Sequence, residues 1–208
     1  MGIDGLRQRI MNRRLGFFAA ISMAVAGCTS SSSNNAAVLA GSGVTQLVVC
    51  HGFDCRNRTT LALGGADARK FASIMSGSSS AAAERTAIGR AIAYFEQRST
   101  QAVGVKDEPK SDISQSGRRG QMDCIDESTN SRTLLRYLES RGLLKFHKVL
   151  GNVSRGFFAD GRYPHSTAVV QDASGEKWAV DSWYEPAGGT PDIMLLSQWL
   201  KRGVMGVR

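Results

Sequence analysis

The sequence predicts an α+β fold in which helices pack on an antiparallel sheet. Three observations favour this class: two short β-rich segments follow residue 43, two amphipathic helical segments occupy the middle of the chain, and a β-hairpin pattern comes later. Strands and helices that occur in separate runs, without a regular alternation, are typical of α+β proteins.

The first 27 residues have the layout of a secretory signal. Four arginines stand among the first 14 residues, the apolar run 15–26 follows, and small residues precede Cys28 in "AVAGC". The run is too short to span a bilayer. The ending "VAGC" resembles the bacterial lipobox, which implies cleavage before Cys28 and acylation of Cys28. Because Thr29 follows the cysteine, the resemblance also implies a lipoprotein located on the outer membrane and facing the periplasm. An ordinary signal peptide cleaved nearby and an uncleaved anchor are the alternatives.

The rest of the chain divides into a tether and one domain. Residues 28–43 are small and polar and predict a flexible tether, whereas residues 44–208 are long enough for a single domain with its own core. The formal net charge is +8, but the basic residues are scattered and no stripe of them is interleaved with aromatic residues. We therefore expect contact with a membrane through the lipid anchor and no nucleic-acid partner.

The domain is expected to begin with strands. The segments "VTQLVVC" (44–50) and "TTLAL" (59–63) are short and rich in β-formers. Farther on, the segment 104–120 has charges, serines, glycines and a proline but almost no apolar residues. It therefore predicts an exposed loop.

Two segments predict amphipathic helices. In the segment 81–99, apolar residues recur at helical spacing and charged residues lie elsewhere around the wheel. The segment 126–144 also gathers its apolar residues on one face, and Gly142 stands where a helix commonly ends. Cys124 therefore lies at or near a helix N-terminus.

The C-terminal part reads as further strands. The segments 143–150, 165–171 and 176–183 are rich in β-branched and aromatic residues. The turn sequence "DASG" (172–175) separates the last two, which predicts a hairpin.

The number of cysteines bears on the chemistry. Acylation would consume Cys28, which leaves Cys50, Cys55 and Cys124, an odd number in an oxidising compartment. Cys50 and Cys55 bracket "HGFD" and can close a small loop, so we predict their disulfide and a free Cys124. Two alternatives stay open: Cys124 pairs with one of them, or Cys50, His51 and Cys55 hold a metal. No second Cys/His pair has zinc-ligand spacing, so we predict neither a metal nor a cofactor.

A free cysteine at a helix N-terminus is a candidate nucleophile. The helix dipole and a neighbouring imidazole favour its thiolate, and the only histidines are His51, His147 and His165. In the predicted hairpin, His165 and Asp181 share a face if the connecting loop has an odd number of residues: three puts them opposite and five puts them diagonal. A four-residue turn would put them on opposite faces and exclude a triad.

The order of these residues resembles the transglutaminase-like branch of the papain-like cysteine peptidases. The resemblance covers the last part of the chain and rests on "DCIDES" around Cys124, "HSTAVV" from His165, and "WAVDSWY" around Asp181. It implies a papain-like core in which Cys124 attacks an amide carbonyl, His165 transfers the proton and Asp181 holds the histidine. No aromatic residue follows the cysteine directly, and the oxyanion donor is Gln121 or the backbone N–H of Cys124.

With the lipoprotein leader, this resemblance implies a cell-envelope lipoprotein that acts on a protein or peptide substrate, as a peptidase or amidase or by acyl transfer to an amine. The alternative is a catalytically inactive lipoprotein that binds or scaffolds. Other candidates have structural interpretations: Asp123 and Asp126 cap the helix, and His147 lies on a strand surface. The large aromatic residues of the C-terminal part are interpreted as core or cleft wall: Trp178, Trp183, Tyr184 and Trp199.

Overall fold

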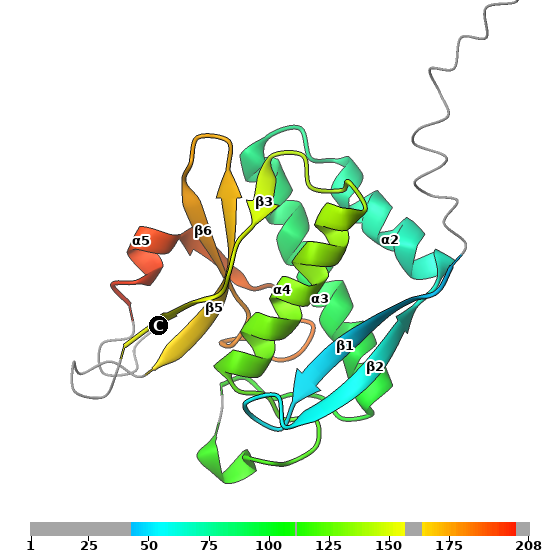
Figure 1. The fold of residues 1–208 in the computed structure, drawn as a ribbon, viewed down its shortest axis with the longest axis vertical. Coiled ribbons are helices and arrows are strands. Elements are labelled where there is room, and N and C mark those ends of the chain that lie inside the picture. Colours follow the sequence, from blue (N-terminus) through cyan, green and yellow to red (C-terminus); the bar gives the residue numbers. More distant parts are fainter. Residues whose placement is uncertain (1–42, 111, 157–163, 203–208) are drawn as a thin grey trace, which may run out of the picture. The chain divides into compact units, whose positions relative to one another are not determined.

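The computed structural model describes residues 43–110, 112–156 and 164–202, all in the larger of the two units into which the chain divides. This part has four α-helices and two antiparallel sheets, which confirms the α+β class (Figure 1). The predicted signal peptide 1–27, Cys28 and all but the last residue of the tether lie outside the described residues.

The first sheet is a two-stranded hairpin. Strands β1 (Thr45–His51) and β2 (Asn57–Leu63) pair in antiparallel register along their whole length. Leu61 and Leu63 of β2 are buried and Ala62 between them is exposed, whereas β1 ends with the three buried residues Val49, Cys50 and His51. The alternation expected for a strand with one face on the core is therefore present along β2. Strand β2 includes the predicted segment 59–63, and β1 covers the predicted segment 44–50 except for Val44.

Helix α3 (Ala81–Val103) includes the predicted helix 81–99. The Ser80 side chain caps its N-terminus by accepting the backbone N–H of Ala83 at 3.1 Å. Gly104 ends it with φ of 83°, a left-handed conformation that glycine adopts at little cost. The stretch up to α4 is mostly exposed loop, as predicted, with one short 3₁₀ turn (Ile113–Gln115).

Helix α2 (Gly65–Ser76) was not predicted from the sequence. Its buried residues are Asp67, Phe71 and Met75, one on each successive turn. The buried stripe therefore has only two apolar members, and its third member is a carboxylate that receives the Arg98 guanidinium at 2.8 Å. A pattern of apolar residues does not detect such a helix.

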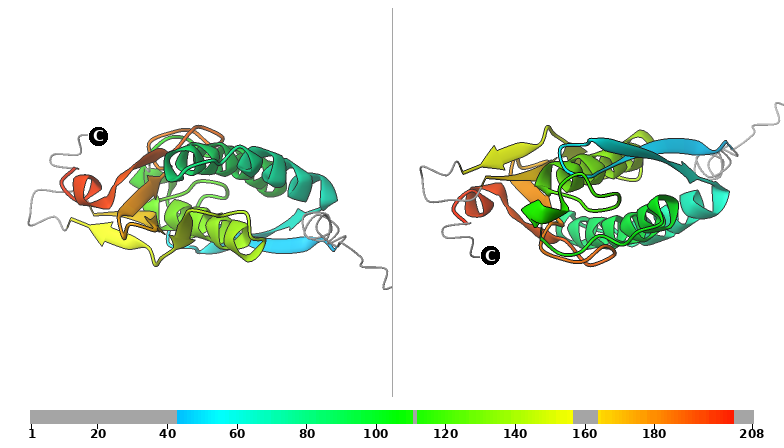
Figure 2. Two further views of the ribbon diagram at one scale, coloured as in Figure 1. Left: turned by 90° about the horizontal axis from the view of Figure 1, so that it is seen from above. Right: turned by 90° about the horizontal axis from the view of Figure 1, so that it is seen from below.

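Helix α4 (Cys124–Ser140) lies at the centre of the described fold. Leu134, Leu135 and Leu138 are fully buried on it. The helix contacts strand β1 of the first sheet, three strands of the second sheet, and α3, beside which it runs (Figures 1 and 2). It ends just before Gly142, whose φ is 66°. None of the described helices is both long and apolar enough to cross a membrane.

The second sheet is antiparallel and has β5 at its centre. Along one path the order is β3-β5-β6-β7, and β4 pairs with the first half of β5 beside β3. The sheet's elements and the short helix after it are β3 (His147–Val149), β4 (Val153–Arg155), β5 (His165–Asp172), β6 (Lys177–Asp181), β7 (Asp192–Leu195) and α5 (Leu196–Trp199).

Strand β5 is buried on both faces, which explains its continuous run of small and β-branched residues. Ala168 and Val170 belong to the main core with α4, whereas Val169 on the other face packs with Leu196 and Trp199. The sheet is therefore enclosed between α4 and α5 where its functional candidates lie.

His147 is not on a strand surface, so that expectation was wrong. Its side chain is buried, and its Nδ1 lies 3.0 Å from Oε1 of Glu84, which is fully buried on α3. Glu84 also accepts the backbone N–H groups of Lys145, Phe146 and His147. Burial favours the protonated form, but these hydrogen bonds outweigh it and hold the pKa of Glu84 below its ordinary value. His147 therefore ties α3 to the start of β3.

Candidate active site

Cys124 is the first residue of α4 and is a free, half-buried cysteine. Asp123 is the N-cap, and its Oδ1 accepts the backbone N–H groups of Ile125 at 3.1 Å and Asp126 at 2.9 Å. Asp126 in turn accepts the N–H of Asp123 at 3.3 Å. Both aspartates therefore have the capping roles expected from the sequence, and they fix the place of the cysteine between them.

His165 and Asp181 share one face of the β5–β6 pair. Five residues separate Gln171 from Lys177, the last paired residues before the turn, so the loop has an odd number of residues. The histidine begins β5 and the aspartate ends β6 in a diagonal arrangement, and both are buried. Nε2 of His165 lies 2.8 Å from Oδ2 of Asp181. The odd number of loop residues therefore puts His165 and Asp181 on one face, as the triad requires.

The two ring nitrogens of His165 have different surroundings. Nδ1 is buried and has no hydrogen-bond partner within the described ranges. The backbone N–H of Ser166, the residue directly after the histidine, donates to the sulfur of Cys124. The start of β5 therefore lies next to the sulfur of Cys124. Nε2 is meanwhile committed to Asp181.

Aromatic rings surround the imidazole. The ring centroids of Trp183, Trp199 and Tyr184 lie 4.7, 5.6 and 5.7 Å from that of His165. Trp199 also donates its indole N–H to Oδ2 of Asp181 at 2.7 Å. Oδ2 of Asp181 is thus the hydrogen-bond partner of both the imidazole and the indole. The aromatic residues therefore form a wall, as expected, and one of them also holds the aspartate.

Arg155 places a buried positive charge behind the pair. It faces His165 in the register of β4 and β5, and its guanidinium carbon lies 4.1 Å from the centre of a Trp199 ring. The guanidinium donates to the carbonyl oxygen of Trp199 and, at 3.4 Å, to the hydroxyl of Tyr184. Burial lowers the pKa of Arg155, while Tyr184 and Asp181 act in the opposite direction. The arginine therefore helps to offset the negative charge of Asp181.

The thiol of Cys124 is protonated at rest, contrary to the thiolate expected from the sequence. Burial is the main cause that raises its pKa to about 12, and the charges of Asp123, Asp181 and Glu127 act in the same direction. The N–H of Ser166 opposes them without overcoming them. The helix dipole alone does not produce a thiolate here, because burial, together with the three carboxylates, opposes it.

Serine side chains connect α4 to β5 near the cysteine. Ser128 donates to the hydroxyl of Ser166 at 3.2 Å, and Ser154 donates to that same hydroxyl at 3.4 Å. Asn152 donates to Ser128 at 3.2 Å. Sequence analysis missed these contacts. The spacing of four residues from Cys124 to Ser128 was the available signal, because it puts both on one helix face.

A cavity of about 20 Å³ lies beside the site and is lined by three acidic residues. Glu96 comes from α3, Asp107 from the loop before α4, and Glu127 from the first turn of α4. Glu96 accepts the backbone N–H of Gly188 at 2.7 Å, and the hydroxyl of Ser182 donates to Glu127 at 3.5 Å. The volume is sufficient for about one water molecule.

These carboxyl groups resist ionisation. Burial raises the pKa of Glu96 to about 8 and that of Asp107 to about 7. Burial, followed by the charges of Glu96 and Asp107, raises the pKa of Glu127 well above its ordinary value, and Glu127 shares a hydrogen bond with Asp107. Sequence analysis missed the cluster, because its members lie far apart in the chain and none is in an apolar motif.

The two oxyanion donors considered from the sequence have different surroundings. The side-chain amide of Gln121 donates to the carbonyl oxygen of Lys106 at 3.3 Å. The backbone N–H of Cys124 has no acceptor within the part of the chain that the structure describes, as is usual in the first turn of a helix. The backbone N–H of Cys124 is therefore the better placed of the two to receive an oxyanion.

The structure joins Cys50 to Cys55 in a disulfide, with their Cα atoms 4.6 Å apart. This is the pairing favoured from the sequence, and it leaves Cys124 free. His51 is not a ligand candidate beside them, because its Nε2 lies 2.9 Å from the hydroxyl of Thr59 and its Nδ1 accepts the N–H of Gly120.

Comparison with models of known families, with curated proteins and with solved structures found no match.

Proposed function

We propose that this protein is a thiol enzyme acting on amide bonds, as a peptidase or amidase or by acyl transfer to an amine. Cys124 is the nucleophile, His165 the base and then the acid, and Asp181 the residue that orients the imidazole. The observation that carries the proposal is the 2.8 Å contact of His165 Nε2 with Asp181, which leaves a buried Nδ1 without a partner among the described residues.

The proposal includes a papain-like or transglutaminase-like core. Its support is the placement of Cys124 at the start of the central helix, packed against an antiparallel sheet whose neighbouring strands carry His165 and Asp181. Fold resemblance alone does not define chemistry, so the proposal depends on the side-chain geometry.

The first step is attack by the sulfur. Because the Cys124 thiol is protonated at rest, Nδ1 of His165 takes its proton as the sulfur bonds to the amide carbonyl carbon. The carbonyl oxygen becomes an oxyanion that the backbone N–H of Cys124 can bind. The carboxylate of Asp181 stabilises the imidazolium that forms.

The second half releases and transfers the acyl group. His165 returns the proton to the leaving nitrogen, the C–N bond breaks, and a thioester remains on Cys124. Water or an amine then attacks the thioester carbon while His165 removes its proton, the C–S bond breaks, and the proton returns to the sulfur of Cys124; the products are an acid after hydrolysis or a new amide after transfer. The same residues serve both reactions.

We also propose that the domain acts at the cell envelope, on the outer membrane facing the periplasm, held by a lipid on Cys28. The support is the leader that ends in "VAGC". Mass spectrometry of the mature N-terminus should find an acylated Cys28, and a Cys28→Ser variant should leave the membrane fraction. A membrane-bound Cys28→Ser variant would contradict the anchor.

One observation favours the second candidate function, an inactive binding or scaffold module. The raised pKa of Cys124 keeps the thiol weakly nucleophilic unless His165 assists it. The two candidates therefore differ in whether the acylation of Cys124 depends on His165.

The test is acylation by p-nitrophenyl acetate, followed by release of p-nitrophenol and by intact mass. Wild-type protein should acquire one acetyl group on Cys124, and Cys124→Ala should acquire none there. His165→Ala should slow acylation by about 10²-fold or more, the usual contribution of a general base.

His147→Asn is the matched control, because asparagine removes an imidazole but keeps an N–H donor for Glu84. It should acylate at the wild-type rate. Acylation of wild type and His165→Ala at equal rates would contradict the enzyme and favour the binding module.

A further inference from the structure

The disulfide closes a loop with an uncommon backbone. Gly52, Phe53, Asp54 and Cys55 have φ values of 85, 69, 53 and 54°, so four consecutive residues are left-handed. Only glycine adopts this region readily, so three of the four residues are strained. Contacts outside the loop must hold it.

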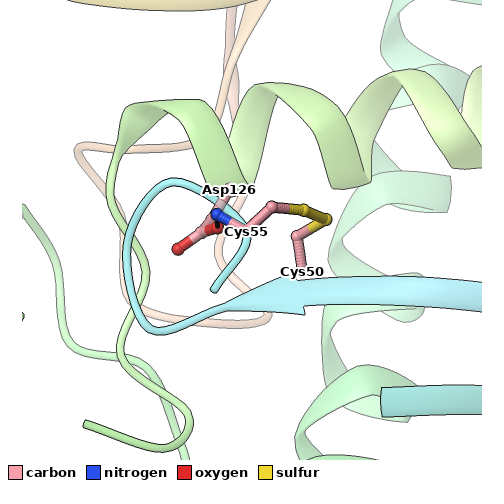
Figure 3. Close-up of side chains that lie close together, drawn as sticks. All are labelled: Cys50, Cys55 and Asp126. Atoms are coloured by element: carbon pink, nitrogen blue, oxygen red, sulfur yellow. Dashed lines mark hydrogen bonds between the residues drawn. A yellow bond between two sulfur atoms is a disulfide. The ribbon is translucent and has the colours of Figure 1, made fainter. Parts of the chain in front are cut away.

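Those contacts come from the start of α4. Asp126 accepts the backbone N–H of Phe53 on Oδ2 at 2.7 Å and that of Cys55 on Oδ1 at 2.6 Å. Asp123 accepts the N–H of Asp54 at 3.1 Å. Figure 3 shows the disulfide and Asp126 together at the first turn of the helix. The loop therefore directs its N–H groups onto both capping carboxylates of α4.

Each of those carboxylates accepts hydrogen bonds from the helix start as well as from the loop. Asp123 also accepts two N–H groups of the first turn, and Asp126 accepts the N–H of Asp123. Cys124 lies between them. Any movement of the loop therefore removes partners from the groups that hold Cys124 in place.

The loop is fastened at its two ends as well. Cys50 is bonded through its N–H and its carbonyl oxygen to the side chain of Asn130, at 2.7 and 2.8 Å. Gly52 donates its N–H to the carbonyl oxygen of Gln121 at 2.6 Å. The disulfide loop and the helix start are thus one hydrogen-bonded unit on the described chain.

The same residues do not form a metal site in this state. The donor atoms of Cys50, Cys55 and Asp126 lie within 4.8 Å of one another. The two sulfurs are bonded to each other, and the carboxylate of Asp126 already accepts three N–H groups. These three residues are better explained as a clamp, meaning that the disulfide loop and the carboxylate of Asp126 hold each other in place.

We propose that the Cys50–Cys55 disulfide is a redox control on Cys124, opened by a dithiol reductant. The proposal rests on the proposed function in taking Cys124 as the reactive group. Cys55 is half-buried and Cys50 is buried. A thiolate of the reductant therefore attacks the sulfur of Cys55, and Cys50 leaves as a thiolate that takes a proton.

The second thiol of the reductant completes the exchange. It attacks the reductant's other sulfur, which is bonded to Cys55 in the mixed disulfide. Cys55 is released as a thiolate, which also takes a proton. The reductant leaves as a disulfide, and two electrons have passed to Cys50 and Cys55. Without the cross-link the left-handed residues relax, the N–H groups leave Asp123 and Asp126, and the first turn of α4 loosens.

Opening the clamp has two opposite effects on Cys124. Water reaches the thiol, so the burial that raises its pKa is reduced and simple alkylation becomes faster. The sulfur also loses the position that the capped helix start fixes, so acylation assisted by His165 becomes slower. A general loss of structure does not produce this pair of effects together with a retained fold.

The experiment measures both rates on wild-type protein before and after treatment with dithiothreitol and its removal under nitrogen. Peptide mapping follows alkylation of Cys124 by iodoacetamide at pH 8, and p-nitrophenyl acetate reports acylation. We expect alkylation to rise at least tenfold and acylation to fall at least tenfold, both reversed on reoxidation.

Two variants complete the design. The double variant Cys50→Ala/Cys55→Ala should have the alkylation and acylation rates of the reduced protein, and dithiothreitol should not change them. Asp123→Ala should be alkylated faster than wild type although its disulfide is intact. Hydrogen exchange should increase in the peptide 122–130 and not in 134–140.

Two outcomes overturn the control. One is an alkylation rate that changes less than twofold in the reduced and the variant protein. The other is global loss of far-ultraviolet circular dichroism on reduction, which would make the disulfide a structural cross-link. If no form of the protein is acylated, the proposed function fails, but the alkylation and exchange measurements still decide the redox control.

Discussion

Replacing Glu96 by glutamine should reduce the sensitivity of the folded protein to alkaline pH. Burial raises the pKa of Glu96 from an ordinary 4.5 to about 8. Between these values the folded protein holds a proton that the unfolded chain has lost, so stability falls as the pH rises from about 4.5 through about 8. Glutamine keeps an oxygen that can accept the N–H of Gly188 and has no charge to bury.

The expected size follows from the two pKa values. A rise from 4.5 to about 8 corresponds to about 5 kcal/mol of ionisation free energy. The residue as a whole is half-buried although its carboxyl group is enclosed, so water offsets part of this amount. We expect Glu96→Gln to gain at least about 2 kcal/mol over wild type between pH 5 and 9. Glu127 adds to the gain, because the charge of Glu96 hinders its ionisation.

The assay is urea denaturation of both proteins at intervals from pH 5 to pH 9. The free energy of unfolding of wild type should fall relative to that of the variant, and the difference should level off above pH 8. Glu176→Gln, on the exposed turn between β5 and β6, is the matched control. A difference between Glu96→Gln and wild type that stays constant with pH would refute the reasoning.

Three further substitutions test other parts of the structure. Leu135→Ala empties a fully buried position and should lower the free energy of unfolding by about 2–5 kcal/mol in urea; a loss under about 1 kcal/mol would mean that the core refills. Gly120→Ala should cost about 2 kcal/mol or more in the same assay, because φ is 84° and the new Cβ would lie 2.5 Å from that of Val105; a stability equal to wild type would contradict this. Trp199→Phe removes the indole donor to Asp181 and should cost about 1–3 kcal/mol while slowing acylation; unchanged acylation would show that this donor does not position the carboxylate.

Periodicity identified the elements whose buried face is apolar. It found α3, α4 and the β5–β6 hairpin, and the odd loop correctly put His165 and Asp181 on one face. It missed α2, whose buried stripe includes Asp67, and the short strands β4 and β7. These elements depend on partners elsewhere in the chain, which a local pattern does not contain.

The errors about charged residues have a common cause. The histidine of β3 was expected on the surface and the charged residues of α3 away from its apolar face, and no role was foreseen for Glu127, yet His147, Glu84 and Glu127 are buried. Each is stabilised by groups about 50 residues or more away in the sequence, such as the Glu84–His147 pair. For the same reason the raised pKa of Cys124 was not foreseen: its causes include Asp181 on another element.

The five-residue link between β5 and β6 constrains how this protein can change by insertion and deletion. Adding or removing one residue between Gln171 and Lys177 would turn Asp181 away from His165 while leaving both strands intact. Adding or removing two would restore the pair. Length variants of this turn that keep activity should therefore differ by even numbers of residues, and an engineered tag should be inserted there in the same way.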